Sequence, residues 1–471
     1  MKENISSKKM AKNVLISVLA QIISLIISFA INFFVPKFID LSNYSYWQTF
    51  VLYSGYVGVL HFGLLDGFIL RYSKYDYEEL DKPLIRSQFQ ILLIFNSFLT
   101  IIGTLIASFF FEGITSTIII LVSVSVITKN ALTYSSYSFQ ITNRINKYAS
   151  VVIFQRLAYG ALIALSLILR INSFYVLCLS EIVSEILAFS LSAFFNKGVY
   201  FGKFAPIKRV LKELKINLSA GVMLMLANWS AILIINGAKT VIQIAFDELV
   251  FGKVAFAFTI SNVFLTFITA ISVVLFPSLK RLDQEKLPSL YISIRNVLAP
   301  VLIVCLLLYF PGAMLIRVWL PKYAESLIYL GVFLPTIIYS SKVNLLTNTY
   351  LKAYRKEKTM LLINLLIALL GLGLFIFFAY LYVDLTLILI SMVFVIVLYS
   401  VISEIVVLKT IKQKLVLDFI YEIIVTASFI LSVLLLDFYV AFIAFGAVVI
   451  IYLILNYKKT AQIFKALKKG N

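Results

Sequence analysis

The chain has 471 residues, is 62% hydrophobic, and carries 41 Lys and Arg against 22 Asp and Glu, which gives a formal net charge of +19. Its mean hydropathy of +1.00 excludes a water-soluble globular protein and a basic nucleic-acid-binding protein, because neither exposes so little polar surface. The combination is typical of a multi-pass membrane protein whose cationic residues lie in the loops on one side of the bilayer.

Apolar segments bounded by charged residues predict an all-α fold of about 14 transmembrane helices, since about 20 residues cross a bilayer. The first six segments are 13–38, 43–70, 84–111, 114–141, 148–170 and 172–196. The next six are 216–240, 249–278, 289–318, 323–352, 358–381 and 383–410. The last two are 416–436 and 438–457. No small-residue cleavage site follows the basic N-terminus, so we expect a retained first span and not a removed signal peptide.

The cationic residues alternate strongly between successive loops. If the N-terminus is cytoplasmic, 33 Lys and Arg fall on the inner side, 6 fall on the outer side, and Lys129 and Lys342 lie within spans. This bias predicts an even number of spans with both termini in the cytoplasm.

The longest polar connection, 197–215, is basic and predicts a cytoplasmic linker between two halves. Residues 1–196 then form an N-terminal six-helix repeat, 216–410 a second one, and 411–471 two additional helices with a basic cytoplasmic tail. The polar ends of spans four and ten, Gln140–Lys147 and Leu351–Lys358, support this six-helix spacing. Two pseudo-symmetric repeats are typical of transporters, with a cavity where the repeats meet.

Four stretches resemble polysaccharide transporters of the MOP flippase superfamily, which includes Wzx-like O-antigen flippases: Phe33–Trp47, Phe62–Tyr72, Phe251–Phe256 and Ala270–Pro277. The resemblance implies a MATE-like arrangement of helices in a bacterial cytoplasmic membrane. It implies alternating-access export of oligosaccharide repeat units linked to undecaprenyl diphosphate, for O-antigen, capsule or exopolysaccharide synthesis. Membrane lipids, a coupling cation (H⁺ or Na⁺) and polysaccharide polymerase or assembly proteins are the further partners we consider, and no nucleic acid is expected.

Two predicted spans carry polar lines at helical spacing. Span one has Asn13, Ser17, Gln21, Ser24, Ser28 and Asn32 on one face, and span seven has Asn217, Asn228, Asn236 and Lys239. In a bilayer such a face meets protein or water rather than lipid. It either lines the cavity or supplies hydrogen bonds between packed helices.

Lys129 is the most specific candidate, because it lies mid-span, where a lysine costs roughly 2.5–3.5 kcal/mol on insertion scales. Gln140 lies on the same face, towards the end of the helix. The lysine is either a cation for the diphosphate or an acidic sugar, or the partner of a carboxylate on a neighbouring helix, for which Glu181 and Glu185 are candidates.

Lys342 repeats this pattern in span ten, beside Asn344 and after Pro335, which can kink the helix. Two lysines at similar depths of the two repeats suit a doubly charged diphosphate. We therefore expect Lys342 and Asn344 to line the cavity.

The candidates for gating or coupling are His61, Asp66 and Arg71 in span two and Glu404 in span twelve, with Glu422 in span thirteen as a further one. A single histidine cannot form a multi-histidine metal site, and Cys178 and Cys305 lie far apart within apolar segments. No nucleotide-binding or zinc-ligand motif is present, so we expect no cofactor, no metal and no enzyme activity.

Three other functions remain as alternatives. A lipid II flippase shares the helix count but typically shows several cavity arginines, where this chain has lysines. A MATE-type drug/cation antiporter tends to carry an acidic site in its first repeat, whereas span one has no carboxylate before Asp40. A membrane polysaccharide polymerase or ligase resembles a protein with a large catalytic outer loop, and the predicted outer loops are short.

Overall fold

A computed structural model describes the backbone of residues 7–73, 75–279, 287–413 and 416–469. Side chains are described over the same ranges except 7–15, 17–18, 263–264, 266–279, 416 and 458–469. Within these ranges the chain is helical and contains no strand, which confirms the all-α prediction. The chain divides into two compact units, Met1–Trp229 and Ser230–Asn471. The boundary lies inside one long helix, α9, and the two-repeat organisation stays a prediction.

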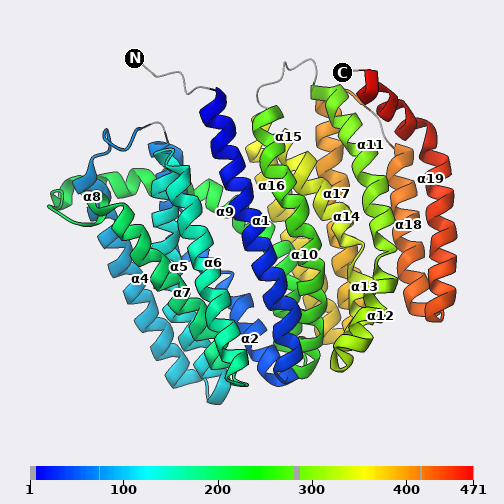
Figure 1. Cartoon of the computed structure of the whole chain (residues 1–471), viewed down its shortest axis with the longest axis horizontal. Helices are drawn as coiled ribbons and strands as arrows, with labels where there is room; N and C mark the ends of the chain where they lie inside the picture. Colours follow the sequence, from blue (N-terminus) through cyan, green and yellow to red (C-terminus); the bar gives the residue numbers. More distant parts are fainter. Residues whose placement is uncertain (1–6, 74, 280–286, 414–415, 470–471) are drawn as a thin grey trace. The chain divides into compact units, whose positions relative to one another are not determined.

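Unit 1 contains the helices up to the first part of α9, and α4 to α7 run side by side within it (Figure 1). Its elements are α1 (Ser7–Phe38), α2 (Leu41–Ser54), η1 (Val57–His61), α3 (Leu64–Tyr72), α4 (Lys82–Phe110), α5 (Gly113–Ile141), α6 (Ile145–Ile168), α7 (Phe174–Phe195), α8 (Lys197–Tyr200) and α9 (Ile207–Ala245).

Unit 2 contains the end of α9 and the remaining elements. These are α10 (Glu248–Leu279), α11 (Leu287–Leu306), α12 (Tyr309–Trp319), η3 (Pro321–Tyr323), α13 (Ser326–Phe333), α14 (Thr336–Ser341), η4 (Lys342–Thr347), α15 (Asn348–Ala353), α16 (Glu357–Phe377), η5 (Phe378–Tyr382), α17 (Leu385–Thr410), α18 (Val416–Leu435) and α19 (Phe438–Lys469). The segments η4 and η5 are π-helical turns within longer helices.

Aspartates cap the N-termini of several helices, because the carboxylate accepts hydrogen bonds from backbone N–H groups that have no partner in the first turn. Asp40 accepts from the N–H of Asn43 at 2.8 Å at the start of α2. Asp81 accepts from Leu84 at 3.1 Å at the start of α4. These caps fix the residues at which α2 and α4 begin.

Two predicted spans are bent rather than straight. The pair α2/η1 and α3 turns by 59°, where Phe62 (φ 50°) and Gly63 (φ 86°) adopt left-handed backbone conformations. The pair α13 and α14–α15 turns by 45° at Pro335, whose ring cannot continue the helical hydrogen bonding. Each bend divides a predicted span, 43–70 and 323–352, into two shorter helices.

The described helices confirm a multi-pass membrane protein. Eleven are long and apolar enough to cross a bilayer, or thirteen if each bent pair is one span, by length and composition. This is close to the predicted count of about 14. The predicted span 249–278 corresponds to α10, and most of the later side chains of that helix lie outside the described residues.

The core that positions the site in unit 1 joins α3, α4, α5 and the first turns of α9. Phe68 stacks on Tyr134 with 4.7 Å between ring centroids, and Val210 and Leu214 of α9 pack into the same cluster. A Cβ added to Gly67 of α3 would lie 1.9 Å from the carbonyl oxygen of Asn217. Only glycine therefore permits α3 and α9 to cross at this distance.

Candidate functional site

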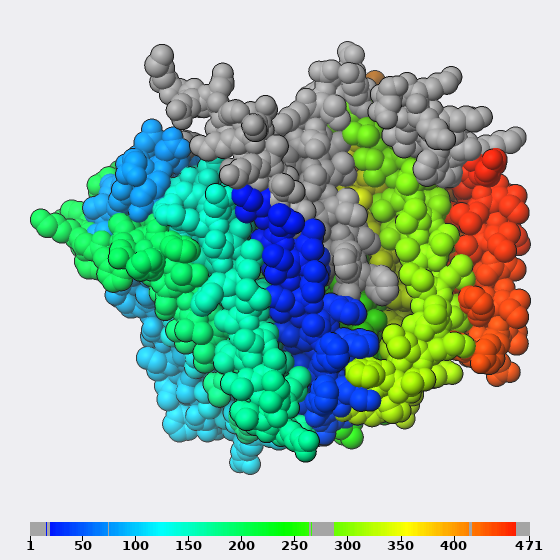
Figure 2. All heavy atoms as spheres, viewed as in Figure 1, coloured from blue at the N-terminus to red at the C-terminus, as the bar shows by residue number. Residues whose placement is uncertain are grey.

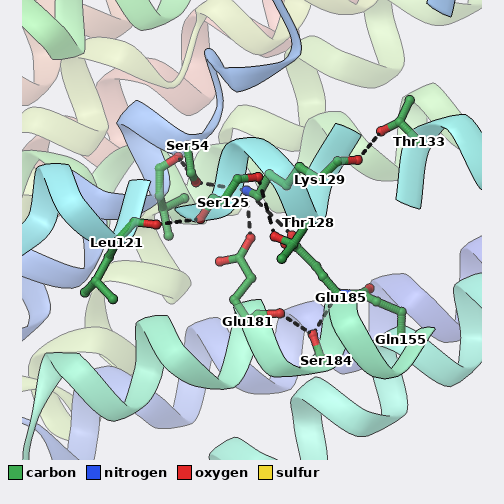
Figure 3. Close-up of polar contacts among 11 residues, drawn as sticks. Ser54, Leu121, Ser125, Thr128, Lys129, Thr133, Gln155, Glu181, Ser184 and Glu185 are labelled. Carbon is green, nitrogen blue, oxygen red and sulfur yellow. Dashed lines mark hydrogen bonds and ion pairs between the residues drawn. The ribbon is translucent and has the colours of Figure 1, made fainter. Parts of the chain in front are cut away.

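Lys129 lies in the middle of α5, and its ammonium points towards α2 and α7 (Figure 3). Its Nζ lies 2.9 Å from the Ser54 hydroxyl, 2.9 Å from Glu181 Oε1 and 4.0 Å from Glu185 Oε1. Both carboxylates come from α7, one helical turn apart, so they present to the same face. The sequence-based alternative of a lysine paired with Glu181 and Glu185 is therefore what the structure contains.

Neutral side chains extend this arrangement to α6. Thr128 donates its hydroxyl hydrogen to Glu185 Oε2 at 2.5 Å. Gln155 of α6 donates to the Ser184 hydroxyl at 3.1 Å. We call Ser54, Thr128, Lys129, Gln155, Glu181, Ser184 and Glu185 the unit 1 polar cluster (Figure 3).

The unit 1 polar cluster is partly exposed at Lys129 and Glu181. The side chains of Lys129 and Glu181 are 24% and 18% exposed, whereas that of Glu185 is 6% exposed. Arg156 of α6 also acts electrostatically on Glu185. An anionic ligand would meet Lys129 and Glu181 before the more buried Glu185. It would have to replace Glu181 as the partner of the ammonium, because an isolated charge at this depth is costly.

Lys342 lies at the first position of η4 and is paired with two carboxylates. Its Nζ lies 2.6 Å from Glu404 Oε2 and 2.6 Å from Glu422 Oε2. Arg295 of α11 binds the other oxygens of the same carboxylates, at 2.5 Å from Glu404 Oε1 and 3.0 Å from Glu422 Oε1. We call Arg295, Lys342, Glu404 and Glu422 the unit 2 charge cluster. It joins α11, η4, α17 and α18.

The unit 2 charge cluster is closed, since none of its four side chains is more than 2% exposed. Its two cations pair with its two carboxylates, which is the condition under which buried charges are tolerated. A further buried carboxylate, Asp418 of α18, also acts electrostatically on Arg295. In this structure neither Lys342 nor Glu404 is open to a ligand or an ion. The sequence pattern did not predict a role for Arg295. It lies near the start of the predicted span 289–318 and counts among the cations of the inner loops. We therefore propose a substrate role for Lys129 alone.

The predicted residues of span two, in η1 and α3, form a third group with residues of α9. His61 Nε2 lies 3.7 Å from Asp66 Oδ2, and Asn228 donates to Asp66 at 3.5 Å. Arg71 lies 2.7 Å from Glu213 and donates to the side-chain oxygen of Asn217. Asp66 and Arg71 thus have partners within unit 1, and their gating role stays a prediction.

The remaining predicted cavity residues do not gather at the unit 1 polar cluster. Gln21, Ser24, Ser28 and Asn32 of α1 are partly buried, and Ser24 donates back to the carbonyl of Ala20 at 2.8 Å. Asn13 and Ser17 lie outside the described side chains. Gln140 is partly buried in the last turn of α5, Asn228 and Asn344 are exposed, and Asn236 is partly buried. The ammonium of Lys239 lies 4.6 Å from the centre of the Phe258 ring.

No protein-family model and no curated protein matches the chain. Solved structures do match, all at low sequence identity. A structure of the lipid II flippase MurJ in an inward closed conformation aligns with a TM-score of 0.67 and 14% identity, over 95% of this chain and 99% of that chain.

An inward-facing multidrug-resistance MATE transporter of the MOP superfamily aligns with a TM-score of 0.61 and 13% identity, over 83% of this chain and 98% of that chain. A MATE protein in its straight conformation aligns with a TM-score of 0.57 and 13% identity, over 85% and 95%. At these identities the comparison shows the fold. The chain has the fold of MOP-superfamily transporters.

Proposed function

We propose that this protein is a flippase that moves oligosaccharide repeat units linked to undecaprenyl diphosphate from the inner to the outer leaflet of a bacterial cytoplasmic membrane, by alternating access. The fold shared over 95% of the chain with a lipid II flippase supports this proposal most directly. The resemblance of the four sequence stretches to polysaccharide transporters favours an oligosaccharide over lipid II. The proposal assigns the chain a transport function and no enzyme activity.

The unit 1 polar cluster supplies the chemistry that this function needs. A diphosphate carries negative charge that must be compensated inside the bilayer, and a lysine provides a compact cation on a flexible stem. Lys129 is partly exposed and lies in the middle of α5, so we expect it to lie far from both membrane surfaces. The diphosphate therefore takes the place of Glu181 beside the ammonium.

This exchange couples substrate binding to a cation. When the diphosphate binds Lys129, Glu181 loses its partner at a depth where an unpaired carboxylate is costly. It then takes up a proton or a sodium ion, which it releases when Lys129 returns. Serine and threonine hydroxyls at Ser54 and Thr128 hold the unit 1 polar cluster together during the exchange.

The test is to deplete the protein and identify which lipid-linked glycan accumulates on the inner leaflet. We expect a complete oligosaccharide repeat unit, restored to the outer leaflet by the wild-type chain. Lys129→Ala should reduce export at least tenfold, whereas Lys129→Arg should retain part of it, because the charge survives. Lys253→Ala, which breaks an ion pair with the exposed Glu325, is the matched control and should export normally.

Two outcomes contradict the proposal. Accumulation of lipid II alone would identify the chain as a lipid II flippase, the second candidate. Normal export by Lys129→Ala at wild-type protein levels would remove the unit 1 polar cluster from the mechanism. Glu181→Gln tests the exchange separately: it should bind the diphosphate lipid more tightly and lose its dependence on the cation gradient.

A further inference from the structure

The connection from α8 into α9 carries bulky apolar side chains that unit 1 leaves uncovered. Phe201, Phe204, Ile207 and Leu211 are 66%, 60%, 60% and 55% exposed. Figure 2 shows this part of the chain as the green projection at the left edge. A loop that faces water does not normally present four large apolar side chains this exposed within eleven residues.

The exposed apolar residues share the first turns of α9 with a row of lysines. At helical spacing, Ile207 and Leu211 lie on one stripe of the helix, and Lys208, Lys212 and Lys215 lie on the adjacent stripe, all exposed. Val210 and Leu214 lie on the other side of the apolar stripe from the lysines, and they pack into the unit 1 core. The packed face fixes the helix, so both outer stripes are held facing outwards.

The acidic groups near this segment are already engaged. Glu213 binds Arg71 at 2.7 Å and accepts from Tyr72, while Asp81 binds Arg209 at 2.6 Å. Among the described residues, no carboxylate lies within ion-pair distance of Lys208, Lys212 or Lys215. The lysine stripe therefore remains available to an external anion.

An apolar stripe flanked by lysines is the pattern of a helix that lies in a membrane interface, where the apolar groups enter the acyl boundary and the lysines meet lipid phosphates. The same helix continues directly into an apolar span, so its first turns begin at the membrane surface. We propose that residues 201–215 form an interfacial anchor that binds anionic phospholipid. We call these residues the interfacial segment. This inference does not depend on which substrate is transported.

The experiment uses the full-length protein in lipid nanodiscs, with Cys178→Ala and Cys305→Ala, and with a polarity-sensitive fluorophore attached through Ile207→Cys. Quenching by lipids with brominated acyl chains reports docking of the interfacial segment. It is compared between discs containing phosphatidylglycerol and discs of phosphatidylcholine alone. The triple variant Lys208→Gln, Lys212→Gln, Lys215→Gln removes the lysine stripe. The triple variant Lys352→Gln, Lys358→Gln, Lys409→Gln removes equal charge from loops that are predicted to lie on the same side.

We expect quenching that increases with phosphatidylglycerol and weakens with salt. Each lysine should contribute about fivefold to the docking equilibrium, so the first triple variant should lose on the order of 100-fold. The control triple variant should behave as wild type. Equal quenching in both lipids and in both triple variants would overturn the anionic-lipid proposal. Absence of quenching would show a water-facing segment, and quenching that depends on protein copies per disc would show a second copy covering it. Either result overturns the proposal.

Discussion

Removing the ammonium from the unit 2 charge cluster should destabilise the protein severely. Lys342→Met retains most of the apolar stem of the side chain but leaves Glu404 and Glu422 with only Arg295 between them. Both carboxylates lie 2.6 Å from the Lys342 ammonium in the wild type, and both are at most 1% exposed, so water cannot replace it.

The expected loss is about 3–5 kcal/mol, the usual consequence of leaving one partner of a buried ion pair uncompensated. A second substitution should recover most of it. In Lys342→Met/Glu422→Gln, Arg295 still binds Glu404 through the 2.5 Å contact, and the unit 2 charge cluster again contains one cation for one carboxylate. Glu422→Gln alone should also destabilise, because it leaves two cations facing one carboxylate.

Thermal unfolding in detergent, followed by size-exclusion chromatography of the folded fraction, measures this order of stabilities. The matched control is Lys253→Met, whose partner Glu325 is 70% exposed and whose loss should cost at most about 1 kcal/mol. A Lys342→Met protein as stable as that control would refute the reasoning. So would a double variant less stable than both single variants.

Three further predictions concern the orientation and the helix contacts. Reporter fusions at Lys203 and Lys465 should read cytoplasmic and one at Asp247 external, because of the loop charge bias; an external reading at Lys203 would contradict the two-repeat interpretation. Gly67→Ala should destabilise the protein by about 1–3 kcal/mol, since the added Cβ would lie 1.9 Å from the Asn217 carbonyl oxygen. Gly373→Ala, whose Cβ would have nothing within 4 Å, should instead stabilise it by about 0.5–1 kcal/mol. Equal unfolding temperatures for the two variants would exclude a close crossing of α3 and α9. Partial burial alone would raise the pKa of Asp40, but hydrogen bonds from Asn43 and Asn172 hold it below its ordinary value of 3.8. The Asp40 carboxylate therefore stabilises the fold above that pH, and this stabilisation is lost as the pH falls through the lowered pKa. Asp40→Ala should cost about 0.5–2 kcal/mol of unfolding free energy at neutral pH and little in strong acid, and a cost that persists in strong acid would contradict the cap.

The fold class follows from the sequence because the bilayer imposes a length on each apolar segment, and the charged residues between segments mark their ends. The bends were harder to predict. Pro335 indicated the bend before α14, since a proline interrupts helical hydrogen bonding. The bend at Phe62 had no comparable signal, because a left-handed phenylalanine depends on the packing around it.

The candidate site was predictable in part. An unpaired lysine in the middle of a span is energetically costly, so the sequence predicted a role for Lys129 and named Glu181 and Glu185 as its candidate partners. Arg295 was missed because an arginine near the start of a predicted span is common at the membrane surface, and only tertiary packing reveals that it is buried. Its partner Glu422 is 127 positions away along the chain. No local pattern reports such a distance.

That separation has a consequence for how the protein is made. At a synthesis rate of about 5–20 residues per second, Arg295 leaves the ribosome roughly 6–25 seconds before Glu422. For most of this interval the two cations of α11 and η4 have no carboxylate of the unit 2 charge cluster, because Glu404 follows Arg295 by 109 positions. Glu404 then remains the only such carboxylate until α18 brings Glu422. Insertion of α18 therefore supplies the last counter-charge, and it completes assembly of this unit rather than merely adding a helix at its edge. A chain that stops after α17 would leave two buried cations sharing one carboxylate.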